Sequence, residues 1–184
     1  MASELTILTN KLSLVYEYVH PKLIFNVSEK DVSRVKISWR RLGQEWPLMF
    51  HLQVAGAANL IRADVNSEPL SKEVEIIRLK HQSRGLAMVM AELQKLQGPA
   101  SDGLLMAMIM VGVLTDPTDS RLPEIYRMSP LATAQHLHLY ARLTIVPATI
   151  QALLDQVNQR GGIHKVKNYG MVEILQLLVL SISV

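Results

Sequence analysis

Three residues of this sequence have types and spacing suited to acid–base chemistry. His51 follows Trp46 and Pro47 in an apolar stretch, where a histidine is either a satisfied core residue or the acid–base group of a pocket. His136 and Tyr140 are four residues apart, so on a helix they share a face and can act as a pair of proton donors. The alternative for this pair is an ordinary polar edge.

The histidines do not form a metal-binding pattern. His136 and His138 are two residues apart and would point to different sides of a helix, whereas helical zinc pairs need a spacing of three or four. His81 lies among Arg78, Lys80 and Arg84, so we expect it to be solvated. The chain has no cysteine, which excludes thiolate metal sites and cysteine nucleophiles. We expect neither a metal nor a cofactor.

Methionine is abundant, with nine in the chain, and several lie in two segments that we expect to be central helices. Methionine adapts its shape, so these side chains either fill the core or line an apolar ligand cavity. The candidate residues for such a pocket are His51, Met106, Met110, His136 and Tyr140.

Apolar residues repeat at spacings of three and four along most of the chain, which predicts helices. We expect an all-α fold, a single-domain bundle of about seven to eight helices over residues 1–184, and no strand. Residues 1–45 form the amino-terminal helices, and residues 115–130 are a connecting loop or a flap over a pocket. The expected helices are residues 5–19, 28–43, 47–61, 71–97, 101–114, 130–146, 147–160 and 169–184.

Two of these segments are apolar on all sides, residues 48–61 and 104–114, so both should be buried and the second should lie at the centre. The longest helix instead has a single apolar row, spaced 3, 4, 3, 4 and 3: Ile76, Leu79, Ser83, Leu86, Met90 and Leu93. A helix face left uncovered would be a contact surface. The first candidate is the carboxyl-terminal helix, with Leu175, Leu178 and Ile182.

Composition narrows the class of protein. Apolar residues make up 49% of the 184, and the net charge is only +3, so the chain is not intrinsically disordered. The densest basic group, residues 34–41, is too short to suggest direct nucleic-acid binding. The amino end lacks a signal-peptide pattern, and residues 171–184 are too few to cross a bilayer. We expect a soluble intracellular protein without a membrane partner.

Three segments together resemble the helical regulatory region of fungal-specific transcription factors of the zinc-cluster type. They are Trp46–His51 before an alanine-rich helix, Leu79–Gln82 leading to Ala100–Leu105, and Leu153–Ile163 before a leucine-rich helix. The resemblance covers Pro47–Val184, and we therefore assign residues 46–184 to the region that resembles this regulatory domain. It implies a helical scaffold for effector sensing and protein contacts, with the nucleus as its compartment. A zinc-cluster DNA-binding domain needs six cysteines, so this chain lacks that domain.

The most specific part of the resemblance is the turn Arg160-Gly161-Gly162. Its physical role is structural, because glycine adopts the positive φ that ends a helix. An arginine in the last turn also interacts favourably with the negative end of the helix.

These observations favour a non-catalytic binding domain whose ligand is an apolar small molecule or a partner protein, in the nucleus or the cytoplasm. We expect that it can form a homodimer. The alternative is a small fungal biosynthetic enzyme, a cyclase or isomerase, that uses an apolar helical pocket with a histidine acid–base group.

Overall fold

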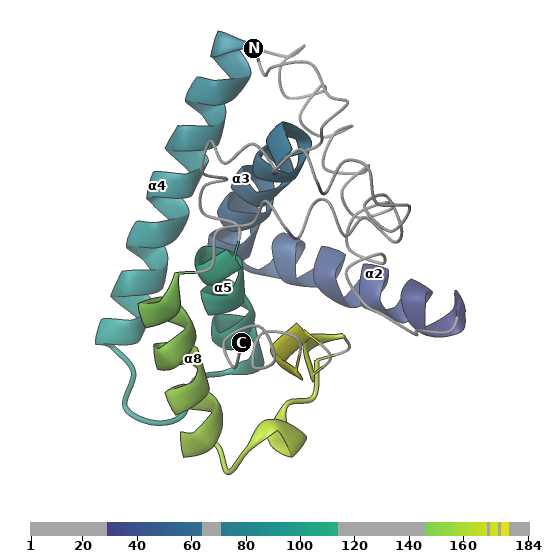
Figure 1. Ribbon diagram of the computed structural model, residues 1–184, viewed down its shortest axis with the longest axis vertical. Coiled ribbons are helices and arrows are strands. Elements are labelled where there is room, and N and C mark those ends of the chain that lie inside the picture. The colour runs from purple at the N-terminus through teal and green to yellow at the C-terminus, as the bar shows by residue number, and fades with distance from the viewer. Residues whose placement is uncertain (1–28, 64–70, 114–145, 169, 173, 177–184) are drawn as a thin grey trace, which may run out of the picture.

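The computed structural model describes residues 29–63, 71–113, 146–168, 170–172 and 174–176 (Figure 1). These residues contain no strand, so the predicted all-α class is confirmed. Six helices are described, against seven to eight expected for the whole chain. They are α2 (Glu29–Glu45), α3 (Pro47–Ala63), α4 (Lys72–Gln94), α5 (Asp102–Val113), α8 (Pro147–Gln159) and the 3-10 helix η4 (Ile163–Lys165). The predicted helices over residues 5–19 and 130–146 and the loop over 115–130 lie outside the described residues.

Prolines and serines set the starts of four helices, close to where the sequence predicts them. Pro47 and Pro147 occupy the first positions of α3 and α8, where a proline has no hydrogen bond to lose. The side chains of Ser71 and Ser101 each accept a hydrogen bond from the amide three residues later, at 3.4 and 3.2 Å. Both serines therefore satisfy amides that the first helical turn leaves unpaired.

The end of α2 differs from the prediction. The sequence predicts a stop at Gly43, but the helix continues to Glu45. The helical turn continues because the Trp46 amide donates a hydrogen bond to the Leu42 carbonyl at 3.0 Å. The following Pro47 disfavours helical geometry at Trp46, so the chain turns there into α3.

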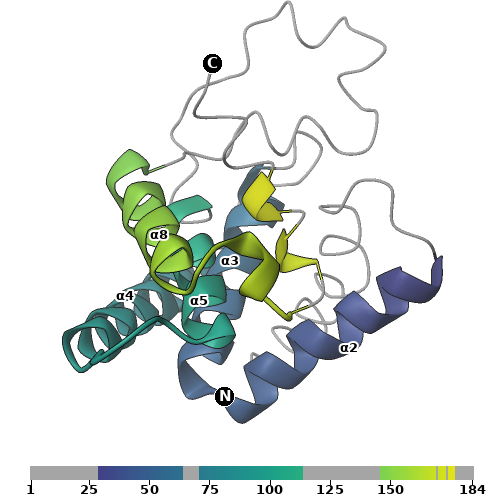
Figure 2. The same cartoon turned by 90° about the horizontal axis from the view of Figure 1, so that it is seen from below.

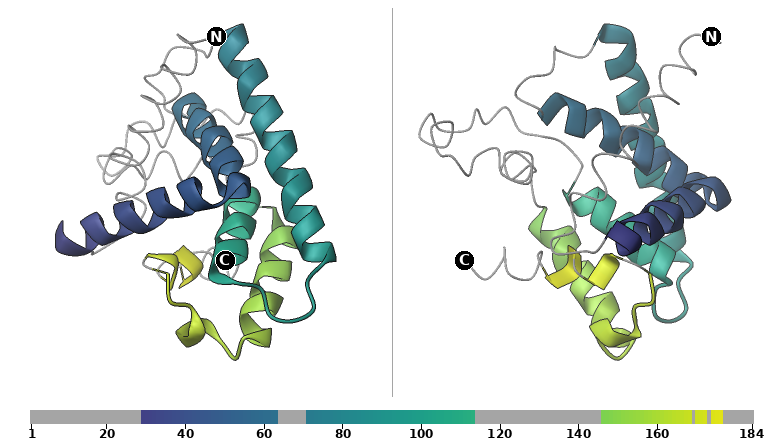
Figure 3. Two further views of the ribbon diagram at one scale, coloured as in Figure 1. Left: turned by 180° about the vertical axis from the view of Figure 1, so that it is seen from behind. Right: turned by 90° about the vertical axis from the view of Figure 1, so that its right-hand side faces the viewer.

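The apolar helix α5 lies at the centre of the described fold, as predicted. Its residues from Leu104 to Gly112 are all buried, and it contacts α3, α4 and α8. Figure 2 shows α5 between α8 and α3. The helices α2 and α4 both pack on α3, and Figure 3 shows α4 along one edge of the molecule.

The start of α5 depends on a close approach to an indole ring. A methyl group added at Gly103 would lie 2.5 Å from the half-buried Trp46 ring, which packs against the core. We expect Gly103→Ala to lower the free energy of unfolding by about 1 kcal/mol or more. Overpacking costs ~1–3 kcal/mol, and the better helix propensity of alanine offsets less than about 1 kcal/mol of it.

Urea denaturation of the two proteins measures this difference. The matched control is Gly98→Ala, where an added methyl meets nothing within 4 Å. This control should change stability by less than about 0.5 kcal/mol. Equal stability of the Gly103 and Gly98 variants would contradict the packing described.

Candidate functional site

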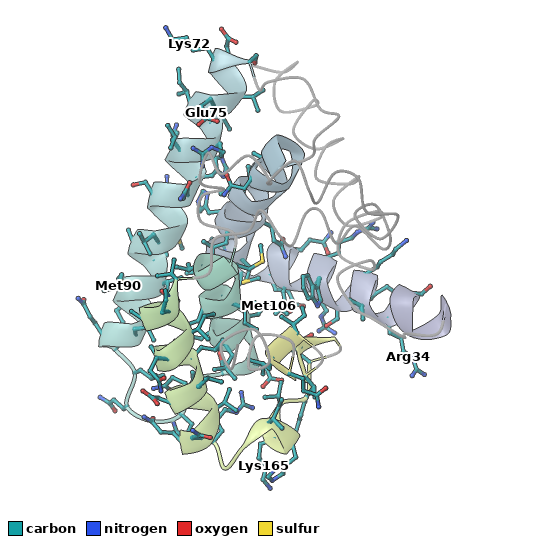
Figure 4. All side chains as sticks on the ribbon, in the orientation of Figure 1. Arg34, Lys72, Glu75, Met90, Met106 and Lys165 are labelled. Carbon is teal, nitrogen blue, oxygen red and sulfur yellow. The ribbon has the colours of Figure 1, made fainter. Side chains whose placement is uncertain are left out.

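The longest of the described helices, α4, carries a row of apolar side chains that faces solvent. We call this row the α4 stripe: Ile76, Leu79, Ser83, Leu86 and Met90. Its four apolar members are between 41% (Leu86) and 57% (Ile76) exposed, and Ser83 is exposed as well. Figure 4 shows Met90 on the outer edge of the molecule and Met106 in its interior. The row that the sequence predicts along this helix is therefore mostly outside the core, and only its last member, Leu93, packs against it.

The face of α4 that packs on α3 contains a buried charge, Arg78. The residue is 2% exposed, and its guanidinium donates two hydrogen bonds to the Glu75 carboxylate, at 2.9 and 2.7 Å. It donates one more to Asn59 of α3 at 2.9 Å and one to Gln82 at 2.7 Å. A buried guanidinium is tolerated only with such partners. The bond to Asn59 crosses to α3, so it favours the side of α4 that carries Arg78 as the side that faces α3.

Two smaller residues complete this buried face, Gly85 and Val89. A methyl group at Gly85 would lie 2.7 Å from Leu52 of α3, so the glycine allows the two helices to approach closely. At ~100° per residue, the α4 stripe is centred about 120° around the helix from Arg78. The contacts that hold α4 in the fold therefore turn its apolar row outward.

His51 of α3 and His81 of α4 form a second feature of this helix pair. Their Nδ1 atoms are 3.0 Å apart, so one ring donates a hydrogen bond and the other accepts it. The ring of Phe50, an exposed residue, contacts both imidazoles edge-on, with its centroid 5.7 Å from each. The prediction that His81 is solvated is wrong, since His81 is half-buried and bonded to His51.

The surroundings of the pair favour neutral imidazoles. Burial lowers the pKa of His51 below 6.5, and the charge of Arg84 lowers it further. Burial also lowers the pKa of His81, with further contributions from His51, Lys80 and Arg84. The pair can share one proton, but a second proton would break the bond between the rings.

Of the other predicted pocket residues, the structure describes only Met106 and Met110. Met106 and Met110 are buried in the core formed with neighbouring helices. His136 and Tyr140 lie outside the described residues. The contact surface expected on the carboxyl-terminal helix is wrong for Leu175, which is buried, and its other two residues, Leu178 and Ile182, lie outside the described residues.

The turn after α8 is built as the sequence suggests, with contacts that spacing did not reveal. Gly161 and Gly162 have φ values of 90° and 105°. Arg160 forms an ion pair with Asp102, with N and O 2.5 Å apart, and donates hydrogen bonds to the carbonyls of Ala100 and Lys165. The turn therefore ties the end of α8 to the start of α5.

Comparisons with protein-family models, curated proteins and solved structures found no match. The resemblance to a fungal regulatory region therefore stays a prediction. In the part of the chain that the structure describes, no group of three or more potential ligands is placed to hold a metal ion. Nor is any helix of these residues long and apolar enough to cross a membrane.

The ion pair between Glu75 and Arg78 gives a stability prediction. Glu75→Gln leaves the buried guanidinium without its counter-charge, so we expect the free energy of unfolding to fall by ~1–3 kcal/mol. The matched control is Glu73→Gln, which removes an exposed carboxylate from the same first turn and should cost less than about 0.5 kcal/mol. Urea denaturation of both variants distinguishes the two cases, and equal effects would show that Arg78 does not depend on Glu75.

The histidine pair gives a pH prediction. Because the folded pKa of each ring lies below 6.5, the unfolded chain binds protons more readily, and stability falls as the pH drops below about 6.5. We expect this loss to be smaller in His81→Gln than in the wild type, as measured by urea denaturation between pH 5 and 7.5. The control is His164→Gln, at an exposed position of η4. An unchanged pH dependence in His81→Gln would refute the coupling.

Proposed function

We propose that this chain is a non-catalytic helical binding domain, and that a protein docks an apolar face on the α4 stripe. The supporting observation is the exposure of four large apolar side chains in one row of the longest helix. Single apolar residues are common on protein surfaces, but a contiguous apolar patch is typical of an interaction site. The row runs along one helix, so an amphipathic helix is the complementary shape.

A protein partner fits the exposed α4 stripe better than an apolar small molecule does. Met106 and Met110, the residues expected to line a cavity, are buried within the core cluster. The resemblance to the fungal regulatory region supports the same kind of function, because that region serves as a scaffold for protein contacts. The enzyme alternative gains no support. It needs His51 as an acid–base group in an apolar pocket, but the Nδ1 atom of His51 is hydrogen-bonded to His81.

Site-specific photo-cross-linking in cells that make the protein tests this proposal. A benzoylphenylalanine at position 83, in the centre of the stripe, should cross-link to another protein molecule. The same probe with Leu79→Glu and Leu86→Glu should lose at least about tenfold of this product. The two substitutions together remove ~1.5–3 kcal/mol of apolar burial, because docking covers only the exposed part of each leucine.

The control probe replaces Ala152, an exposed residue of α8. It should give no comparable product. The double glutamate variant should remain folded, because 49% of Leu79 and 41% of Leu86 are already exposed. The proposal fails if position 83 gives no intermolecular product, or if the product survives the two glutamates.

A further inference from the structure

The α4 stripe has the spacing of a coiled-coil seam. Its members follow one another at intervals of three and four residues, with Leu93 continuing the series. The average of 3.5 is the repeat at which two helices wrap around each other with their apolar positions in register. In this repeat, Ile76, Ser83 and Met90 take the a positions, and Leu79, Leu86 and Leu93 take the d positions.

Within the part of the chain that the structure describes, no helix covers this seam. The opposite side of α4 is occupied by α3 and α5, which pack on it from within the molecule. Figure 1 shows α4 along one edge of the described helices, with α2, α3, α5 and α8 on one side of it, and the left view of Figure 3 shows the same arrangement from behind. At ~1.5 Å per residue, the segment from Ile76 to Met90 offers a line of contact about 21 Å long.

We propose that the occupant of the α4 stripe is a second copy of this chain, paired antiparallel about a twofold axis that crosses α4 between Ser83 and Leu86. This proposal rests on the proposed function, and it names the partner. A twofold interface requires a surface that complements itself. In this register Leu79 lies opposite Met90 of the second copy.

The size of the central side chains favours the antiparallel register. Ser83 then lies opposite Leu86 of the second copy, so a small residue meets a large one in both central layers. A parallel pair in register would place Ser83 opposite Ser83 and leave a gap in the middle of the seam. Such a gap loses apolar contact and forces two hydroxyls into an apolar layer.

The charges beside the seam are compatible with the same register. In an antiparallel pair, the edge formed by Glu73, Lys80, Ala87 and Gln94 meets the same edge of the second copy. Lys80 then faces Ala87 and Glu73 faces Gln94, so no like charges oppose each other. A parallel pair would bring Lys80 towards Glu75, whose carboxylate is already bound twice by Arg78.

Sedimentation velocity of the purified full chain tests the association. We expect a reversible dimer whose fraction rises between about 1 and 500 μM, because the seam is shorter than the three to four heptads of a long coiled coil. Leu79→Glu with Leu86→Glu should raise the dissociation constant at least about tenfold. The matched control, Ala148→Glu with Ala152→Glu, adds the same charge to exposed positions of α8 and should associate like the wild type.

Cross-linking tests the register, and the absence of native cysteine makes it specific. Glu73→Cys and Gln94→Cys are made in separate chains, since both residues are exposed ends of the same edge. A short bismaleimide should join one variant to the other in a mixture. Neither variant alone should form a linked dimer, because in an antiparallel pair two residues 73 lie about 30 Å apart.

The outcomes separate this proposal from the proposed function. A wild type that stays monomeric overturns the homodimer, whether position 83 then cross-links to a different protein or to residues 1–28 of its own chain. In the first case the proposed function survives, and in the second both proposals fail. A linked dimer of Glu73→Cys alone overturns the antiparallel register.

Discussion

The orientation of α4 depends on one buried charge, the guanidinium of Arg78. A desolvated arginine needs its donors paired, and the partners that α4 and α3 supply are Glu75, Gln82 and Asn59. Glu75 and Gln82 lie on α4 itself, and the third partner, Asn59, can be reached only when Arg78 points at α3. The same rotation sets Gly85 against Leu52, where a larger residue would not fit. The polar and steric requirements of this contact therefore agree on one orientation of the helix.

The surface of the protein follows from that orientation. With Arg78 inside, the apolar row of α4 faces away from the core and becomes a surface suited to a helical partner. The core is formed chiefly by α5, and α4 contributes Val89 to it rather than the residues of the stripe. The histidine pair belongs to the same helix contact, so protonation affects the packing of α3 on α4 through His51 and His81.

Helix positions could be read from the sequence because capping residues and prolines act locally. Ser71, Ser101, Pro47 and Pro147 mark helix starts within a residue or two of those observed. The orientation of α4 could not be predicted in this way, because an apolar row ordinarily indicates the buried side of a helix. Arg78 overrides that rule through partners 3, 4 and 19 residues away, and the last of these requires knowing that α3 packs on α4. The pairing of His51 with His81 depends on the same tertiary contact.

Thiol labelling of two single-cysteine variants tests the orientation of α4 most directly, because the natural chain contains no cysteine. Leu86→Cys lies on the α4 stripe, and Val89→Cys lies on the buried face three residues later. At low protein concentration, the cysteine at position 86 should react close to the rate of an unfolded peptide. The cysteine at position 89 should react at least about 100-fold more slowly, since the reagent reaches it only when the structure opens. Equal rates, or faster labelling at position 89, would contradict the account.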